Sequence, residues 1–220
     1  MADAEPPPAT KARTAAEAVA ALDGGATFCR FDCMRGGIGP ATTLAAAMRG
    51  NATVTNLDLS CNSIDAAGCA ALAGALGRHA SLRRLNLGAN AVCDGGAVAL
   101  AAAIGGGGAV RLEALDLHAN AIRDEGGAAL LAAAVAPGGS LTALDLRSNY
   151  ISDAVVAALV EGVQQAGSKL KLCALTGCDI TPGAWAQLEA AVASPGTALE
   201  SLGGDDDATA ALLGTICAIS

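Results

Sequence analysis

One pattern recurs five times along the middle of the chain: a Leu or Val, two residues, Leu, one residue, Leu, two residues, and then Asn or Cys. In the weaker fifth copy, Cys173 replaces the second Leu and Cys178 replaces the Asn. A fixed period of this length is typical of a solenoid, in which each repeat packs only against its neighbours. The repeat therefore predicts one domain with a long shared surface. The copies start 28, 30, 29 and 29 residues apart, at Val54, Leu82, Leu112, Leu141 and Leu170.

The composition suits thin, closely stacked layers. Hydrophobic residues make up 53% of the 220 residues but aromatic residues only 2%, so Ala and Leu carry the apolar content. The apolar runs at 97–104 and 128–136 are far shorter than the roughly 20 residues that a membrane-spanning helix needs. We therefore expect a soluble protein with no membrane insertion.

Charge and cysteine content narrow the partners and the compartment. The net charge of −8 argues against a nucleic-acid partner, because there is no basic stripe to bind phosphates. Residues 1–13 lack the apolar stretch of a secretory signal, and we expect a flexible segment there. The eight cysteines include no Cys-x-x-Cys pair, which predicts free thiols and a reducing, cytoplasmic location.

Each repeat predicts a strand, a loop and a helix. In the third copy, the alternation of Leu112, Leu115 and Leu117 indicates a short strand with its leucines inward. Asn120 should turn the chain and form a ladder with the Asn of the neighbouring copies. Asp124, like Asp94 and Asp153 in the adjacent copies, precedes an Ala-rich run and is predicted to cap that helix.

This pattern resembles the leucine-rich repeat family, specifically the subclass like ribonuclease inhibitor, whose repeat reads L-x-x-L-x-L-x-x-N-x-I-x-D-x-G-x-x-x-L. Residues 82–100 and 112–130 match this form, and the resemblance covers roughly residues 28–213. It implies an α/β leucine-rich repeat solenoid: a short right-handed horseshoe with a concave parallel sheet and convex helices. Proteins of this family chiefly bind other proteins.

Departures from the pattern suggest the domain limits. Phe28 begins a shortened first repeat, Val155 replaces the Gly of the fourth copy, and the copy that begins at Leu199 lacks its third Leu and its Asn. We expect a single domain over 14–220, because both edges of a solenoid sheet need covers. It would comprise a capping helix at 14–24, about six to seven repeats over 28–203 and a C-terminal cap at 204–220.

The residues between the strand leucines should point to the concave face, because side chains alternate along a strand. Tyr150, just after Asn149 on the loop rim, is a further contact candidate. The candidate partner-binding residues on the strands are Arg30, Asp32, Asn56, Asp58, Arg84, Asn86, Asp116, His118, Asp145 and Arg147.

Two interpretations of the acidic residues remain open. They could form a docking strip for basic groups on a partner, or Leu-Asp-Leu could simply be the usual strand sequence of the family. Three arginines at neighbouring positions favour a mixed polar surface, and Asp116 can pair with Arg147 on the next strand. Surface pairs of this kind contribute about 0–1 kcal/mol each, so they would set orientation more than affinity.

The sequence argues against a catalytic, phosphate-binding or metal-binding site. His118 lies near Asp116 and Asp145, but no nucleophile accompanies them and an open concave face is wet, whereas catalysis needs a partly dry pocket. The glycine run 105–108 follows a helix and precedes a strand, the reverse of a phosphate-binding loop. We read Asp205–Asp207 as a helix-terminal charge cluster and Trp185 as a packing residue. We therefore expect no enzymatic activity, cofactor, metal or small-molecule substrate.

The function we expect is that of a non-enzymatic protein–protein interaction module, a scaffold or adaptor subunit of a larger assembly. By family analogy, a cytoskeletal or ciliary complex is a candidate location. Two alternatives remain: a regulator of a small GTPase resembling the Ran GTPase-activating protein, and a sensor fragment like the repeat region of innate immune receptors.

Overall fold

The computed structural model describes residues 10–31, 38–105, 110–165 and 167–203, and residues 38–40 by their backbone alone. Over these residues the chain alternates strand and helix. Seven strands form one parallel sheet whose spatial order is the order of the sequence. The strands are β1 (Thr10–Ala12), β2 (Phe28–Phe31), β3 (Asn56–Asp58), β4 (Arg84–Asn86), β5 (Ala114–Asp116), β6 (Ala143–Asp145) and β7 (Leu172–Ala174).

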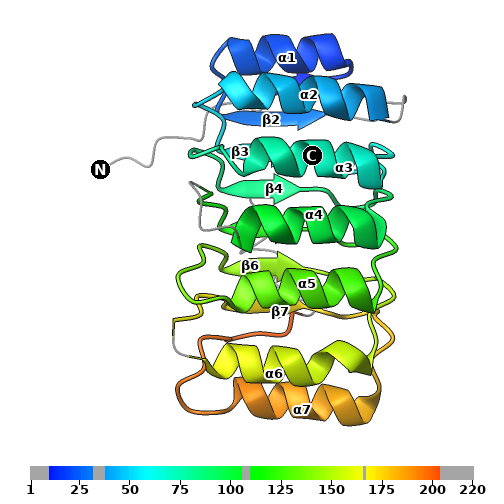
Figure 1. Ribbon diagram of the computed structural model, residues 1–220, viewed down its shortest axis with the longest axis vertical. Coiled ribbons are helices and arrows are strands. Elements are labelled where there is room, and N and C mark those ends of the chain that lie inside the picture. The colour runs from blue at the N-terminus through cyan, green and yellow to red at the C-terminus, as the bar shows by residue number, and fades with distance from the viewer. Residues whose placement is uncertain (1–9, 32–37, 106–109, 166, 204–220) are drawn as a thin grey trace.

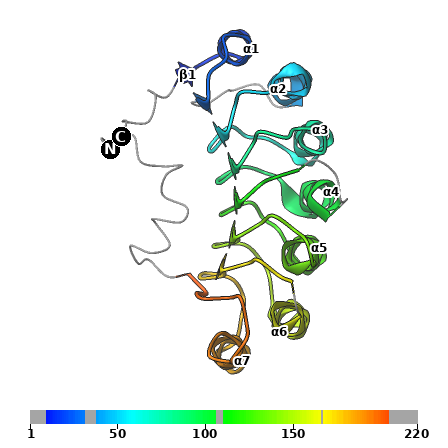
Figure 2. The ribbon, with the colours of Figure 1, turned by 90° about the vertical axis from the view of Figure 1, so that its left-hand side faces the viewer.

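The helices form a second layer outside the sheet. Figure 2 shows all of them on the convex side of an arc whose inner side is the sheet. Figure 1 shows the same helices stacked one above another in sequence order. They are α1 (Ala15–Asp23), α2 (Ile38–Gly50), α3 (Ala66–Leu76), α4 (Cys93–Gly105), α5 (Asp124–Val135), the short 3-10 helix η1 (Asp153–Val155), α6 (Val156–Gln164) and α7 (Pro182–Val192). The predicted α/β solenoid, with a parallel sheet that does not close into a barrel, is confirmed.

The repeated leucines form the core between the two layers. Leu57, Leu85 and Leu115 lie opposite one another in the strand register and are at most 1% exposed. Burying a leucine side chain stabilises a fold by about 1.5–3 kcal/mol, so this column supplies much of the favourable free energy. The same repeat positions thus face the same interior in each turn of the solenoid, as the pattern predicts.

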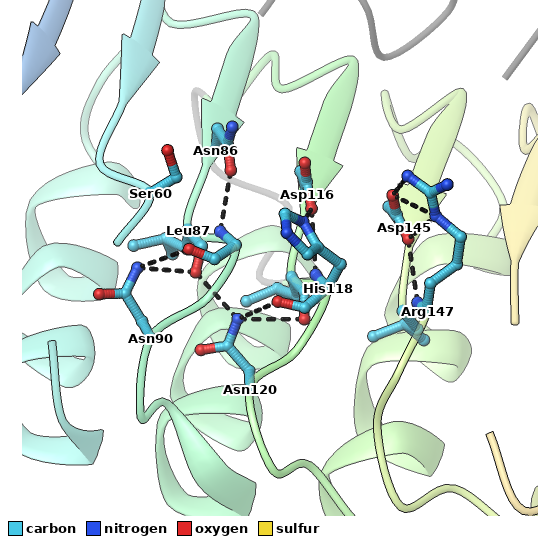
Figure 3. A network of polar contacts seen from close by, with 12 residues as sticks. Ser60, Asn86, Leu87, Asn90, Asp116, His118, Asn120, Asp145 and Arg147 are labelled. Carbon is cyan, nitrogen blue, oxygen red and sulfur yellow. Dashed lines mark hydrogen bonds and ion pairs between the residues drawn. The ribbon is translucent and has the colours of Figure 1, made fainter. Parts of the chain in front are cut away.

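The asparagine ladder is confirmed. Asn120 Nδ2 donates to the carbonyl oxygens of Leu117 in its own repeat, at 3.1 Å, and of Leu87 in the preceding repeat, at 2.9 Å. Its Oδ1 accepts the backbone N–H of Val92, again from the preceding repeat. Asn149 repeats this arrangement one turn later. Each amide therefore satisfies loop groups that the three-residue strands leave unpaired. Figure 3 shows two of these amides, Asn90 and Asn120.

The predicted helix caps differ from those in the structure. Asp94 is the second residue of α4 and Asp124 is the first residue of α5, so both lie inside the first turns of their own helices. Asp94 Oδ1 accepts the backbone N–H groups of Arg123, at 2.8 Å, and Gly126, at 3.0 Å, which open the next helix. Asp124 likewise accepts from Ser152 N at 2.7 Å. The carboxylates therefore tie each helix start to the one that follows.

A glycine in the first turn of α4 and of α5 allows neighbouring helices to approach closely. A Cβ at Gly96 would lie 2.9 Å from the Cβ of Cys69 on α3, and one at Gly126 would lie 2.8 Å from Ala97 on α4. Val155 occupies the corresponding place in the fourth repeat, where the first turn is the 3-10 helix η1. A hollow of about 350 Å³ there lies between α5 and α6.

The described ends of the domain change one predicted boundary. Thr10–Ala12 was expected to be flexible but forms β1, which pairs with β2. The predicted capping helix is α1, whose N-cap Thr14 accepts from Glu17 N. The strand and the helix together protect the first edge of the sheet. The C-terminal cap expected at 204–220 lies outside the described residues.

Candidate functional site

The fifth repeat position forms a buried column on the concave side of the sheet. Asp58, Asp116 and Asp145 are 1%, 5% and 0% exposed, and Asn86 is 0% exposed. Buried carboxylates cannot contact basic groups of a partner. The docking strip of exposed acids is therefore not supported for these residues. The strand register places Arg30, and not Asp32, opposite Asp58, so the alignment predicted for the first repeat is wrong by two residues. Asp32 itself lies outside the described residues.

Each side chain of the column accepts a hydrogen bond from the residue two positions later, as Figure 3 shows for Asp116 and Asp145. Asp58 Oδ1 accepts from Ser60 N at 3.0 Å, Asn86 Oδ1 from Gly88 N at 2.8 Å, and Asp145 Oδ1 from Arg147 N at 2.9 Å. This is the turn that Asp and Asn favour at the end of a strand. These hydrogen bonds therefore end each strand and begin the loop that follows.

The positive groups of the face bind the same carboxylates. Arg147 donates from Nε and Nη2 to Asp145, with a shortest distance of 2.7 Å, and Arg30 Nε lies 3.7 Å from Asp58 Oδ2. The partner expected for Arg147 was Asp116 on the preceding strand. The residue two positions before Arg147 holds it instead in a fork-like pair. Much of the acidic charge of the strip is thus balanced within the strip.

His118 forms the corresponding pair with Asp116. Its Nδ1 lies 2.7 Å from Asp116 Oδ1, and this hydrogen bond raises the pKa of His118, although partial burial acts in the opposite direction. The ring lies against Gly88 on the preceding repeat, where any Cβ would overlap it. Because Gly88 has no side chain, the imidazole of His118 fits beside it.

One cluster of the described residues has the chemistry of a metal site. Ligand atoms of Asp116, His118 and Asp145 lie within 4.8 Å of one another. Both carboxylate oxygens of Asp145 already accept from Arg147, so a cation would have to displace a guanidinium. The arrangement fits an internal ion-pair network better than a metal centre.

The cysteines of the described part offer no activated nucleophile in the core. Burial raises the pKa of Cys29 to about 11 and that of Cys69 and Cys173 to about 12, so these thiols stay protonated. All six described cysteines are free, as predicted, and Cys61 and Cys93 are exposed. Cys33 and Cys217, the Gly run beyond residue 105 and the Asp205–Asp207 cluster lie outside the described residues.

The loop rim beside the concave face is exposed. Tyr150 is 59% exposed, and the guanidinium carbon of Arg123, from the preceding repeat, lies 6.0 Å from its ring centroid. Sequence reasoning selected Tyr150 but missed Arg123, although a fixed period places their loops side by side. Along this rim the residue before each ladder Asn has a left-handed backbone: Cys61, Ala89, Ala119 and Ser148.

The remaining candidates divide the concave face into two parts. Asn56 and Arg84 lie opposite each other on β3 and β4 and are half-buried, so the first strands present polar groups. The equivalent residues of β5, β6 and β7 are Ala114, Ala143 and Leu172, which are buried. Trp185 on the convex helix α7 is half-buried, and its Nε1 donates to Glu189 at 3.1 Å.

Comparison with known families identifies the repeat. A family model described as Leucine Rich repeat matches residues 50–73, 78–101 and 112–131. These segments are similar to leucine-rich repeats, and they contain the copies that begin at Val54, Leu82 and Leu112. The copies that begin at Leu141 and Leu170 lie outside the matched segments, yet each also forms a strand followed by a helix. No curated protein matches the sequence significantly.

Among the described residues, no helix combines the length and the apolar character required to cross a bilayer. Leucine-rich repeat domains typically bind other proteins.

Proposed function

We propose that this protein is a non-enzymatic scaffold or adaptor that binds another protein through the loop rim and the polar first half of the concave face. The observation that carries the proposal is the exposed Tyr150 with Arg123 stacked beside it. Tyr and Arg are the residues most enriched at the energetic centres of interfaces. Arg84 and Asn56 add half-buried polar groups on β3 and β4.

The leucine-rich repeat family supports the general role, and the ion pairs refine the choice of surface. Because Asp58, Asp116 and Asp145 are engaged with their own strands, the candidate contact groups are the side chains around them. We further propose the ribonuclease-inhibitor-like subclass, because repeats of 28–30 residues that alternate strand and α-helix are its pattern. A cytoplasmic location, including a cytoskeletal or ciliary complex, is part of the same proposal.

Affinity measurements with surface variants test the proposal. A partner is first captured from native extract and identified by mass spectrometry, and its affinity for the full chain is then measured. Tyr150→Ala should weaken binding about tenfold or more, as expected for an interface anchor. Val98→Ala on α4, a 39% exposed convex position, is the matched control and should change nothing.

Equal affinity of the Tyr150→Ala, Arg123→Ala and Arg84→Ala variants would move the interface away from the rim and contradict the proposal. The alternative of a GTPase regulator remains a prediction. Acceleration of GTP hydrolysis by catalytic amounts of this protein would favour that alternative, and stoichiometric binding alone would favour the adaptor.

A further inference from the structure

The last three strands carry an aliphatic cluster on the concave side, the concave apolar patch. It consists of Ala114, Ala143, Leu172 and Ala174, which are 3%, 1%, 0% and 0% exposed. The strand register aligns Ala114, Ala143 and Leu172 in one row across the sheet. These residues form a buried cluster separate from the main core, on the opposite side of the sheet from the helices.

The position of this patch is unexpected for a solvated sheet face. A strand with one face in the core and one in water alternates apolar with polar residues. The first strands follow that rule, with Asn56 on β3 and Arg84 on β4 at the same repeat position. Leu172 has an aliphatic side chain at that position and is 0% exposed, so another group must cover it.

The described chain ends beside this patch. Ser201 forms a bridge with Leu172, and Thr176 Oγ1 donates to the carbonyl oxygen of Gly203 at 2.9 Å. A Cβ at Gly203 would lie only 2.5 Å from the Cβ of Ala174, so the backbone of Gly203 lies directly against the patch. The residues that follow therefore begin at its border.

The sequence of residues 204–220, the C-terminal segment, complements this face. Asp205–Asp207 is followed by Ala-Thr-Ala-Ala-Leu-Leu-Gly-Thr-Ile-Cys-Ala-Ile-Ser, which holds no charged side chain. Three adjacent strands span only about 10 Å, far less than a segment of this length can reach.

We propose that the concave apolar patch is the docking site of the C-terminal segment of this same chain. The aliphatic residues of the segment cover Ala143 and Leu172. This intramolecular contact does not depend on the proposed partner function. Any partner of the C-terminal half of the concave face would have to displace the segment.

Hydrogen exchange of the full chain, followed by mass spectrometry of peptides, tests the docking. We expect amides within 204–220 to exchange about tenfold or more slowly than an unstructured chain would. Ala143→Arg should abolish this protection and leave the protection of α4 unchanged. Val98→Arg, which adds the same side chain to the convex face, is the matched control and should preserve both.

Three results would overturn the proposal. They are exchange of 204–220 at the rate of an unstructured chain, protection that survives Ala143→Arg while α4 stays protected, and protection that appears only at high protein concentration. The last result would assign the patch to a second copy. If Ala143→Arg fails to fold, Leu172→Ala only shortens a concave side chain, and a several-fold loss of protection confined to 204–220 is then expected.

Discussion

At the scale of single residues, short polar side chains replace backbone pairing in this protein. Strands of three residues leave many loop N–H and C=O groups without a partner in the sheet. Asn120 donates to backbone carbonyl groups of two repeats, and Asp145 accepts from the backbone N–H and the guanidinium of Arg147. Buried polar groups stabilise a fold only when their partners are all in place, so removal of one member should be costly.

Replacement of Asn120 by Ala tests this dependence. Asn120→Ala removes the donors to Leu87 O and Leu117 O and the acceptor of Val92 N, all of which are buried. We expect the free energy of unfolding to fall by about 2–4 kcal/mol, because buried groups then lack partners. Urea denaturation measures this loss. Asn56→Ala, at a half-buried concave position, is the control, and an equal cost for the two variants would refute the role of the ladder.

The two histidines should titrate on opposite sides of the ordinary pKa of about 6.5. The hydrogen bond to Asp116 raises the pKa of His118, whereas burial lowers that of His79, whose Nε2 has no partner among the described atoms. The contribution of His118 to stability is thus complete at low pH and is lost as pH rises through its folded pKa. That of His79 is lost as pH falls through its folded pKa.

NMR titration of the imidazole signals checks this expectation, with His118→Gln to assign them. Unfolding measured against pH provides a second readout: removal of His118 should abolish the loss of stability above about pH 6.5. A His118 signal that titrates below the His79 signal would contradict the assigned pairing.

At the scale of the elements, glycines determine how closely neighbouring helices pack. Gly96 on α4 faces α3, and a Cβ there would meet Val92 at 2.7 Å and Cys69 at 2.9 Å. Where Val155 stands in place of Gly, the helix begins with a 3-10 turn and a hollow opens against α5. One side chain per repeat therefore decides whether the convex layer is continuous.

Adjacent glycines of α4 offer a matched test of this packing. Gly96→Ala should destabilise the protein by about 1–3 kcal/mol through overpacking. Gly95→Ala meets nothing closer than Ala66 Cβ at 3.5 Å, so it should stabilise the helix by about 0.5–1 kcal/mol. Thermal and urea unfolding measure both changes. Equal effects of the two variants would show that the helix contact does not limit the packing.

At the scale of the whole molecule, each repeat should stabilise the repeats on either side of it. Strand pairs, ladder amides and the bond from Asp94 to the start of α5 all join one repeat to the next. A solenoid of this kind behaves as a row of coupled units, so an interior defect affects both sides and a terminal defect remains local.

Two leucines at the same repeat position test this coupling. Leu130 on α5 and Leu188 on α7 are 1% and 0% exposed. Truncation of such a leucine to Ala costs about 2–5 kcal/mol. Hydrogen exchange should show that Leu188→Ala opens mainly α7, whereas Leu130→Ala lowers protection in the repeats on both sides of α5. Loss of protection at α3 from Leu188→Ala would indicate a single cooperative unit instead.

The periodic positions could be predicted from the sequence because each repeats the same environment. Leu85 and Leu115 occupy the same inward position in successive repeats. Asn120 closes the same kind of loop as Asn90. The candidate site was less predictable. Asp145 occupies an outward strand position, but its side chain is short enough to reach the N–H of Arg147, and that local bond buries it.

The sequence by itself determined the order of the layers, the inward leucines and the amide ladder, because a regular period repeats one set of contacts. Only the tertiary structure decided what lies between repeats. Asp94 accepts from the backbone N–H of Arg123, which precedes α5 and lies 29 residues later, and the guanidinium of Arg123 lies over the ring of Tyr150 from another loop. Such contacts depend on the rise and rotation from one repeat to the next, which side-chain packing sets and no single repeat contains.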